Sequence, residues 1–446
     1  MLNGSYFYLL ALLLLGTRML SGSWRKTVLL PWVVLTAPML CGAGLANLGL
    51  VPALITPWSD STHILVLSGS AALLAGSFTL RGVRSSLDPV ELEVRWHEAT
   101  LLKVLVGLTG LALVTNAAQF LIAGQVPMLS ADPDRARMVA SQNGYLHIFS
   151  VLSGHLIPIG ALILFTGKSL GRGTRRTLKA VIAVNFLVLL LWVARGMLIY
   201  PIVTVIAMNY LLDSASFTLK KLVTVALLFL FIVSGVKYLR DVTRFGFDYN
   251  GTGQQSSTSG LERGLLANAS VLYLTIALNY EILNRYLATV PLLAPYSGGR
   301  IMAGNLLAYL PGTGTPYSEL QFQNAVLKKN EPDYTLTSTF FGVPYLDFGL
   351  PGVLIVSFLA GLLYRTAWLR IRERGTPWSV FFYGYLVSMA TFIPYAFMYT
   401  QVSFTWFLLS SYPIIFLCSC RMEGTSLWRR RGLLHAGADQ SIPRLH

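Results

Sequence analysis

The feature of this 446-residue chain that most restricts its fold is a series of long apolar runs separated by polar segments. A helix needs about 20 consecutive, mostly apolar residues to cross a lipid bilayer. By that criterion the chain has about eleven candidate spans, and these occupy residues 5–19, 28–51, 63–80, 104–123, 146–167, 180–194, 197–212, 222–236, 350–364, 378–398 and 402–418. Alternation of polar and apolar residues at strand length does not recur. The sequence therefore predicts an all-α, polytopic membrane protein.

The composition agrees with this class. Apolar residues make up 54% of the chain and charged residues only 12%, which is far too hydrophobic for a soluble domain of this length. The three cysteines, Cys41, Cys418 and Cys420, fall in or beside the apolar runs, so no disulfide framework is expected. The first run has no basic leader and no small-residue cleavage site, and we expect it to be retained as a helix.

Basic residues gather in alternate loops, and the positive-inside rule assigns these loops to the cytoplasm. The opposite short loops hold only Arg135, Arg137 and Arg195. This asymmetry predicts an N-terminus outside and a C-terminus in the cytoplasm. The formal net charge of +15 follows from the same topology, so nucleic acid is not expected as a partner. The predicted cytoplasmic loops contain Arg25, Lys26, Arg81, Arg84, Arg95, Lys103, Lys168, Arg172, Arg175, Arg176, Lys179, Lys220, Lys221, Arg365, Arg370, Arg372, Arg374, Arg421, Arg429, Arg430, Arg431 and Arg444.

One long polar segment, residues 237–349, interrupts the apolar runs. The predicted orientation puts it on the outer face, as an extracytoplasmic cap with spans on both sides. The chain thus divides into a bundle of about eight helices at 1–236, the cap at 237–349, about three more spans at 350–420 and a basic cytoplasmic tail at 421–446. Residues 261–290 have an amphipathic helical pattern, which is typical of a helix lying along a membrane surface.

Several arginines on the predicted outer face are candidates for binding an anionic ligand. Arg195 lies in a tight turn between two apolar spans with no acidic residue nearby, and a charge at such a depth points to a cavity, an ion pair or a ligand. A cap on the carbonyls of the preceding helix is the alternative. Arg240 and Arg244 are four residues apart and share one helical face, with an ion pair to Asp241 as their alternative role.

A further arginine lies near the start of a predicted short helix. Ser130 or Asp132 can cap this helix, Pro133 suits its first turn, and Arg135 comes next. An arginine just above a span can reach a lipid phosphate, and the alternative is that it only extends to the headgroup region.

Four features in this order resemble one known family. They are the Pro127-Met-Leu-Ser130 loop followed by an arginine, the isolated Arg195-Gly196 turn, an arginine closing the next span, and a long loop ending in the Thr-Ser-Thr-Phe-Phe-Gly motif and the Tyr-Leu-Asp-Phe-Gly-Leu-Pro-Gly motif within 337–352. The pattern resembles the Wzy-type O-antigen and oligosaccharide repeat-unit polymerases. The resemblance extends over most of the chain, although its motifs are short.

The resemblance implies a metal-independent, polytopic glycosyltransferase of the GT-C class that needs no cofactor. Such an enzyme joins repeat units carried on undecaprenyl diphosphate into an O-antigen or capsule-type polysaccharide, at the outer face of a bacterial inner (plasma) membrane. Its expected partners are the lipid-linked donor and acceptor, membrane lipid and a chain-length regulator protein.

The residues fit this chemistry. Positive charge stabilises a lipid diphosphate as it leaves the sugar, and arginine binds phosphate oxygens through two parallel hydrogen bonds. A carboxylate is then wanted to take the proton of the acceptor hydroxyl. We expect Asp347 in this catalytic role, beside Tyr345, with Glu281 as second candidate. The candidates for the diphosphate site are Arg195, Arg240, Arg244, Arg135, Arg137, Arg285 and Arg300.

Each carboxylate also has a plainer interpretation. Asp347 precedes the span at 350–364, where it can compensate the positive N-terminal end of a helix. Glu281 and Arg285 are spaced for a helix salt bridge.

Three functions remain open at this point. The related O-antigen ligases also carry a long outer loop, but resemblance to them calls for a histidine motif, and residues 237–349 contain no histidine. A flippase or other transporter of lipid-linked oligosaccharides is the non-enzymatic alternative. Transporters often show paired halves with interrupted helices, whereas the two parts of this chain are unequal. No cluster of metal-ligating residues is visible in the sequence.

Overall fold

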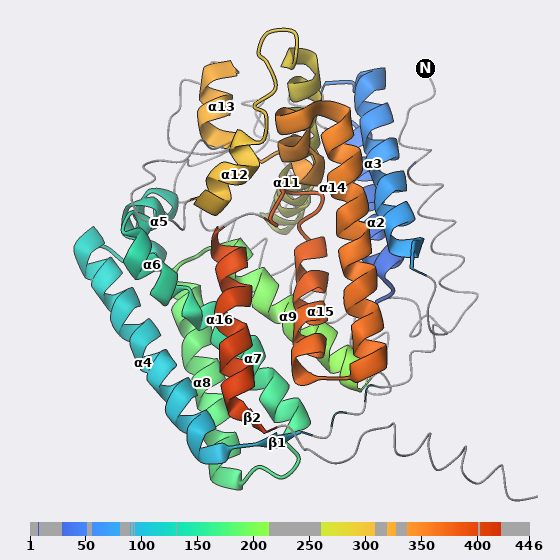
Figure 1. Ribbon diagram of the computed structural model, residues 1–446. Coiled ribbons are helices and arrows are strands. Elements are labelled where there is room, and N and C mark those ends of the chain that lie inside the picture. The colour runs from blue at the N-terminus through green and yellow to red at the C-terminus, as the bar shows by residue number, and fades with distance from the viewer. Residues whose placement is uncertain are drawn as a thin grey trace, which may run out of the picture.

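The structure, a computed structural model, describes residues 29–50, 56–80, 94–130, 132–213, 260–307, 319–326, 337–399 and 402–420, with isolated positions at 8, 90 and 92. Within these ranges the chain is largely helical (Figure 1), and the one sheet consists of β1 (Arg95–Trp96) paired antiparallel with β2 (Ser419–Cys420). The helices are α2 (Pro31–Asn47), α3 (Asp60–Phe78), α4 (Glu98–Ala123), the 3₁₀ turn η2 (Pro127–Leu129), α5 (Pro133–Ser141), α6 (Gly144–Ser150), α7 (Leu152–Thr166), α8 (Arg172–Leu191), α9 (Arg195–Leu212), α11 (Gly260–Thr289), α12 (Arg300–Leu307), α13 (Glu319–Val326), α14 (Thr339–Arg374), α15 (Pro377–Ala390) and α16 (Val402–Cys418).

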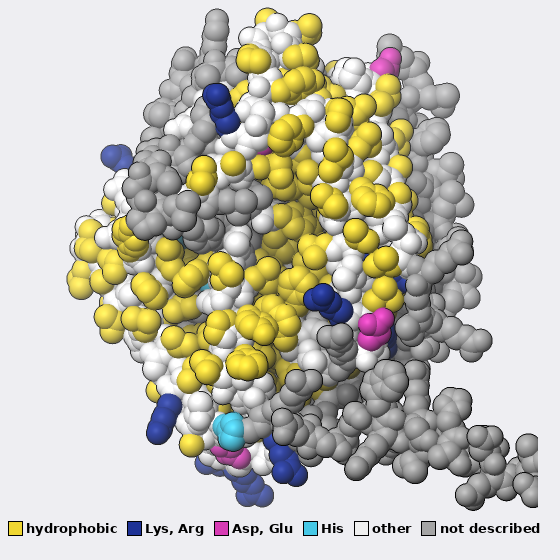
Figure 2. Space-filling view, viewed as in Figure 1, with side chains coloured by type: hydrophobic (Ala, Val, Ile, Leu, Met, Phe, Trp, Pro, Cys, Tyr) yellow, Lys and Arg dark blue, Asp and Glu magenta, His cyan; other side chains and the backbone are white. Residues whose placement is uncertain are grey.

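Four helical stretches within the described residues are long and apolar enough to cross a membrane: Asp60–Phe78, Glu98–Ala123, Gly144–Thr166 and Thr339–Glu373. Pro31–Asn47, Gly196–Leu212 and Thr405–Cys418 are apolar but shorter. Hydrophobic side chains cover much of the face shown in Figure 2, and a group of Lys and Arg lies at its lower end. The expected helical membrane protein is confirmed, whereas the count of about eleven spans stays a prediction. The predicted spans at 5–19 (apart from Tyr8) and 222–236 lie outside the described residues.

Two local predictions are confirmed. The amphipathic pattern at 261–290 corresponds to α11, a helix of 30 residues. Asp132 caps α5 by accepting a hydrogen bond from the Arg135 amide, and Pro133 occupies the first turn, where its missing N–H costs nothing.

The longest helix in the described part of the chain, α14, has 36 residues and differs from its predicted bounds at both ends. The sequence places a span at 350–364 and leaves the preceding motif in the loop, whereas α14 already begins at Thr339. Gly349 interrupts the helix with φ 67° and ψ −155°. A Cβ at this glycine would lie 2.9 Å from the Tyr296 ring, so both the backbone and the space there require glycine. The motif therefore forms a separate helical segment joined to the long part of α14 by a kink.

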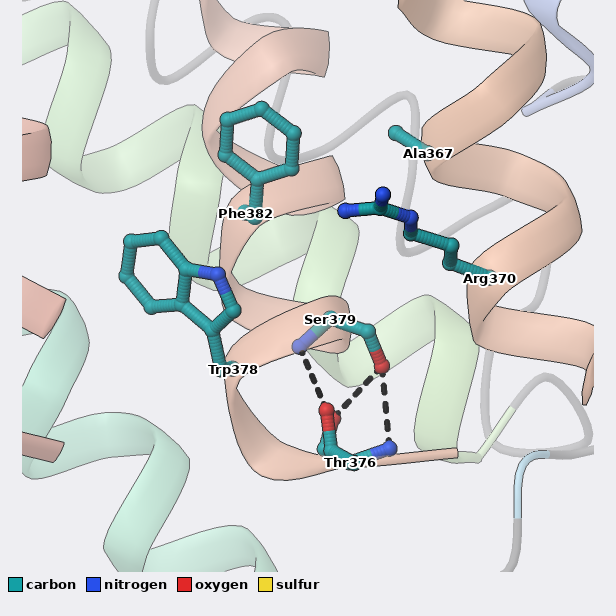
Figure 3. Close-up of a pocket in the computed structure, with 6 residues that line it drawn as sticks. All are labelled: Ala367, Arg370, Thr376, Trp378, Ser379 and Phe382. Atoms are coloured by element: carbon teal, nitrogen blue, oxygen red, sulfur yellow. Dashed lines mark hydrogen bonds between the residues drawn. The ribbon is translucent and has the colours of Figure 1, made fainter. Parts of the chain in front are cut away.

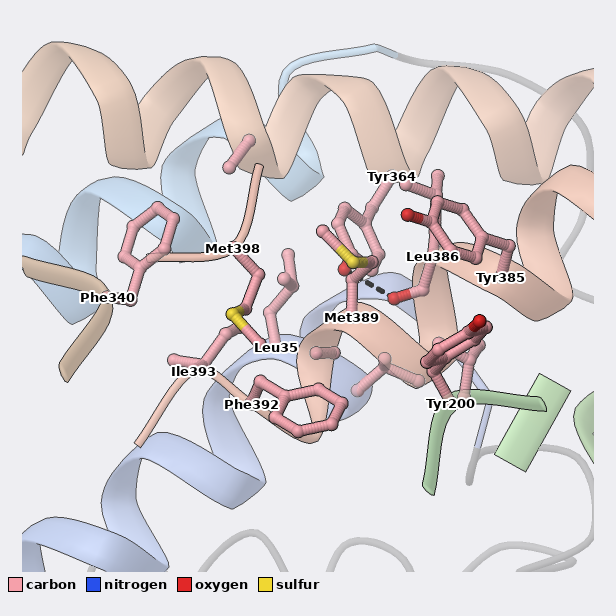
Figure 4. Close-up of a cluster of buried hydrophobic side chains, with 14 of the residues drawn as sticks. Leu35, Tyr200, Phe340, Tyr364, Tyr385, Leu386, Met389, Phe392, Ile393 and Met398 are labelled. Carbon is pink, nitrogen blue, oxygen red and sulfur yellow. Dashed lines mark hydrogen bonds between the residues drawn. The ribbon is translucent and has the colours of Figure 1, made fainter. Parts of the chain in front are cut away.

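Close packing fixes α14 in the molecule. A Cβ at Gly76 would lie 2.1 Å from the Phe358 carbonyl oxygen, and one at Gly361 would lie 2.2 Å from that of Leu73. Small residues allow such backbone approach between membrane helices, so α3 and α14 lie in direct contact. On the side facing α15, the Tyr364 hydroxyl donates to the Leu386 carbonyl at 2.5 Å among buried aromatic and aliphatic side chains (Figure 4).

The helices define two opposite ends of the molecule. The helices α11, α12 and α13 gather with the start of α14 at one end, and the turn between α14 and α15 lies at the opposite end (Figure 1). We call the first the cap end. It contains the described residues of the predicted cap, and most of the predicted catalytic and binding residues that the structure describes.

Candidate active site

Asp347 lies in the kinked first part of α14, and its side chain is 1% exposed. Its carboxylate accepts hydrogen bonds from the Ser297 hydroxyl, from the Ile301 amide at 3.1 Å and from the Met302 amide at 2.9 Å. The two amides belong to the first turn of α12, where free N–H groups and the helix dipole favour a carboxylate. Asp347 therefore caps α12, a helix far from it in sequence. The plainer interpretation placed it just ahead of the helix at 350–364, but it lies inside α14.

Two other predicted site residues lie beside Asp347. The Tyr345 hydroxyl donates to the Val290 carbonyl at 2.8 Å, and its ring meets the edge of the Tyr296 ring with centroids 5.9 Å apart. Arg300, the first residue of α12, is exposed. The structure thus brings Asp347, Tyr345 and Arg300 together, with the loop that leads into α12 wrapped over the start of α14.

Glu281 is the second buried carboxylate on the predicted outer face, and its side chain is 1% exposed. It accepts hydrogen bonds from the Thr56 amide and hydroxyl, both at 2.9 Å, and from Arg285 Nε at 2.8 Å. The expected helix salt bridge is confirmed, and the Arg285 side chain remains 55% exposed. One turn further along α11, Asn284 accepts a 2.7 Å bond from the Thr62 hydroxyl. Glu281 and Asn284 together hold the segment that enters α3.

Among the remaining arginines, Arg135 is exposed and Arg137 half-buried on α5. Ala140 of the same helix packs in a small buried cluster with Trp192 and Ala194, which directly precede Arg195. The structure therefore brings the two α5 arginines and the Arg195 turn into one neighbourhood. The side chain of Arg195 and the whole of Arg240 and Arg244 lie outside the described residues.

The turn before Arg195 is held by a buried hydrogen bond and has a strained backbone. Trp192 Nε1 donates to the Asn116 side-chain oxygen at 2.5 Å inside the helical bundle. Val193 has a φ of 50°, which a β-branched residue rarely adopts. Such strain persists only where surrounding structure enforces it, and it is concentrated at functional sites in proteins.

Sequence reasoning missed a third carboxyl at the cap end. Glu319, the half-buried first residue of α13, accepts through Oε1 from the Tyr286 hydroxyl at 2.9 Å and from the Ser338 hydroxyl at 2.5 Å. The Gln323 amide donates to the Tyr286 hydroxyl at 2.5 Å. Burial raises the pKa of Glu319 to about 7, and the donors around it lower this pKa by a smaller amount. We call Glu319, Tyr286, Ser338 and Gln323 the Glu319 cluster.

A signal for Glu319 does exist in the sequence. A basic residue three or four positions from a glutamate stabilises a helix through an ion pair, as Arg285 does for Glu281. Glu319 has Phe322 and Gln323 at those positions, so no local charge compensates it. The acidic and basic residues of the predicted cap are nearly equal in number, and this near-neutral total hides the lack of a local partner for Glu319.

A pocket of about 230 Å³ lies at the other end of the molecule, at the turn between α14 and α15. The guanidinium of Arg370 points into it beside the Phe382 ring (Figure 3). None of the predicted site residues lines this pocket, so it is separate from the candidate active site. Its lining consists of Ala367, Arg370, Thr376, Trp378, Ser379 and Phe382.

The apolar helices and the polar cap end define an integral membrane protein with a candidate active site at one end of its bundle. Residues 39–393 match the family model described as Putative O-antigen polymerase, which is more than half of the chain. The chain therefore belongs to the O-antigen polymerase family, which confirms the resemblance and supports a polymerase role in O-antigen synthesis. No curated protein and no solved structure matched the chain.

Proposed function

We propose that the protein is a glycosyltransferase that joins oligosaccharide repeat units, carried on undecaprenyl diphosphate, into an O-antigen or capsule-type polysaccharide. The observation that carries the proposal is the family match, because it spans both the apolar helices and the cap end with its buried carboxyl groups. The donor and acceptor are both lipid-linked, so a site beside membrane-spanning helices suits their chemistry.

The arginines supply the donor side of this reaction. As the bond between sugar and diphosphate breaks, negative charge grows on the phosphate oxygens, and nearby guanidinium groups stabilise it. Arg195, Arg135 and Arg137 share one neighbourhood and form the core of the proposed diphosphate site. Arg240 and Arg244 are proposed to complete it.

Arg285 and Arg300 are the remaining candidates for the diphosphate site, and they lie near Glu281 and Asp347 respectively. Glu281, Asp347 and Tyr345 remain proposed site residues. Glu281 and Asp347 accept several hydrogen bonds from other parts of the protein, which favours a structural role at the site. Their roles as proton acceptors stay predictions.

The proposed setting is the inner membrane of a bacterium, with the protein crossing it several times. The N-terminus and the cap end face outward and the C-terminal tail faces the cytoplasm, as the distribution of cations predicts. Reporter fusions at Ser256 and Gly437 should report opposite compartments, and the same compartment for both would overturn this topology. A chain-length regulator is the proposed protein partner.

The test of the function is reconstitution of the purified protein with a synthetic undecaprenyl-diphosphate-linked repeat unit. We expect a ladder of products without added nucleotide sugar, and we expect it to persist in the presence of a metal chelator. Transfer of a single unit to a different lipid acceptor would indicate a ligase instead. Movement of the substrate across the vesicle membrane without new glycosidic bonds would indicate a transporter.

A further inference from the structure

The Glu319 cluster is built from three separate elements. Tyr286 comes from α11, Glu319 and Gln323 from α13, and Ser338 from the residue before α14. An additional hydrogen bond joins the neighbouring Thr337 hydroxyl to the Asn279 side chain on α11. A polar connection of this kind between three helices at the cap end orients the Glu319 carboxyl firmly.

The Ser338 hydroxyl is placed by the family-like motif at 337–342. Thr339 has a φ of 24°, an uncommon backbone conformation for a β-branched residue. A Cβ at Gly342 would lie 1.9 Å from Ser338 Oγ, so glycine at this position leaves room for the hydroxyl. The Phe340 amide donates to the Ile393 carbonyl at 2.8 Å and fixes the start of the helix. The motif thus directs a hydroxyl group at Glu319.

The donors to Glu319 are uncharged, unlike the environment of Glu281. Both hydroxyl groups meet at Oε1, and among the described residues no lysine or arginine is seen to form an ion pair with this carboxyl. Tyr286, whose own pKa is raised by burial and by the nearby Glu319, is the titratable group seen to contact it in the described part of the chain. A half-buried carboxyl whose hydrogen-bond donors in the described part of the chain are uncharged exchanges its proton near neutral pH, which suits proton transfer.

We infer that Glu319 is the general base of the reaction and takes the proton of the acceptor sugar hydroxyl. This inference rests on the proposed polymerase function. The acceptor oxygen forms a bond to the anomeric carbon of the donor while its O–H bond breaks, and the proton passes to the Glu319 carboxylate. The bond between the anomeric carbon and the diphosphate oxygen breaks, and its electron pair leaves with the lipid diphosphate. Water then removes the proton from Glu319.

The experiment compares Glu319→Gln with the parent protein in reconstituted vesicles, with initial rates of repeat-unit joining measured from pH 5.5 to 8.5. Gln keeps the side-chain shape and an oxygen acceptor for both hydroxyl donors, but it cannot take a proton. We expect the parent rate to rise with pH through about 7. We expect Glu319→Gln to be slower by about 100- to 10,000-fold and to lose that rise.

Two further variants separate catalysis from folding. Glu373→Gln removes an exposed carboxylate at the far end of α14 and should leave the rate and its pH dependence unchanged. Glu319→Asp keeps a carboxyl group and should retain a pH-dependent rate with a shifted midpoint, even if Glu319→Gln fails to fold. A Glu319→Gln variant within a few-fold of the parent, or an unchanged midpoint in Glu319→Asp, would overturn the inference. If the parent itself forms no polymer from the lipid-linked unit, the proposed function fails instead.

Discussion

Asp347 and Glu319 are carboxyl groups at the same end of the molecule, but their surroundings differ. Two backbone amides and a hydroxyl donate to Asp347, and all three belong to the segment that begins α12. Glu319 has two neutral hydroxyl donors from other elements and a pKa raised to about 7 by burial. The first arrangement holds the start of α12 in place, whereas the second provides a carboxyl group that exchanges its proton near neutral pH. Two carboxyl groups at the same end of the molecule therefore differ in role according to the groups that surround each of them.

The largest expected effect concerns the proposed diphosphate site, which the reaction needs whether Asp347 or Glu319 is the base. If Arg195 binds the diphosphate, Arg195→Ala should abolish polymer while the protein still inserts in the membrane, because growing phosphate charge loses its partner. Arg195→Lys should restore little, since an ammonium group lacks the paired geometry of a guanidinium. Gel analysis of the products in reconstituted vesicles measures both variants.

Arg176→Ala provides the matched control, because Arg176 is an exposed arginine near the start of α8 and lies in a predicted cytoplasmic loop. It should make polymer normally. Normal polymer from Arg195→Ala would remove Arg195 from the proposed site.

Much of the fold follows from the sequence, because the apolar runs and the caps are local signals. The pattern at 261–290 predicts α11, and the Asp132-Pro133 pair predicts the start of α5. The start of α14 at Thr339 was missed because the motif contains Gly342, Pro344 and Gly349, which usually end helices. Packing against α3, α11 and α15 overrides that preference.

The site was only partly predictable for a related reason. The Glu281–Arg285 pair is four residues apart, so its spacing alone predicts the salt bridge. The bonds of Asp347 to α12 and of Glu319 to Tyr286 and Ser338 join residues 19 to 46 positions apart. No local pattern encodes such a contact, and only the folded chain shows which carboxyl each hydroxyl reaches.

A second prediction tests whether Asp347 is mainly an anchor. Asp347→Ala leaves two amides of α12 without their acceptor, and an unsatisfied buried group costs about 1 to 3 kcal/mol. Asp347→Asn keeps one acceptor oxygen and should retain a rate within a few-fold of the parent. Thermal unfolding in detergent should show the larger loss for Asp347→Ala. A folded Asp347→Asn protein with a rate lower by 100-fold or more would instead make Asp347 the base, and the comparison with Glu319 would be reversed.

A third prediction sharpens the comparison through pH. The Ser338 hydroxyl lowers the pKa of Glu319, so Ser338→Ala should raise this pKa and move the rise in rate to higher pH. The rate at pH 7 should then fall by a few-fold, because less of the base is deprotonated. Ser297→Ala removes the corresponding hydroxyl donor from Asp347 and should leave the midpoint in place. Equal midpoints in the parent and Ser338→Ala would show that the pH dependence of the rate does not come from Glu319.

The smallest expected effect is that of Glu281→Gln. This side chain is buried, but its charged partner Arg285 is largely exposed, and helix pairs of this kind contribute only about 0.3 to 0.5 kcal/mol. Gln can still accept from Thr56, so residues 56–59 should keep their place beside α11. We therefore expect initial rates within a few-fold of the parent and a small decrease in the unfolding temperature. Arg285→Gln breaks the same ion pair from its other side and should cost a similar amount of stability. If Glu281→Gln folds normally and loses the rate that Glu319→Gln retains, the proton acceptor is Glu281, which is ion-paired to Arg285, and Glu319 is not the base.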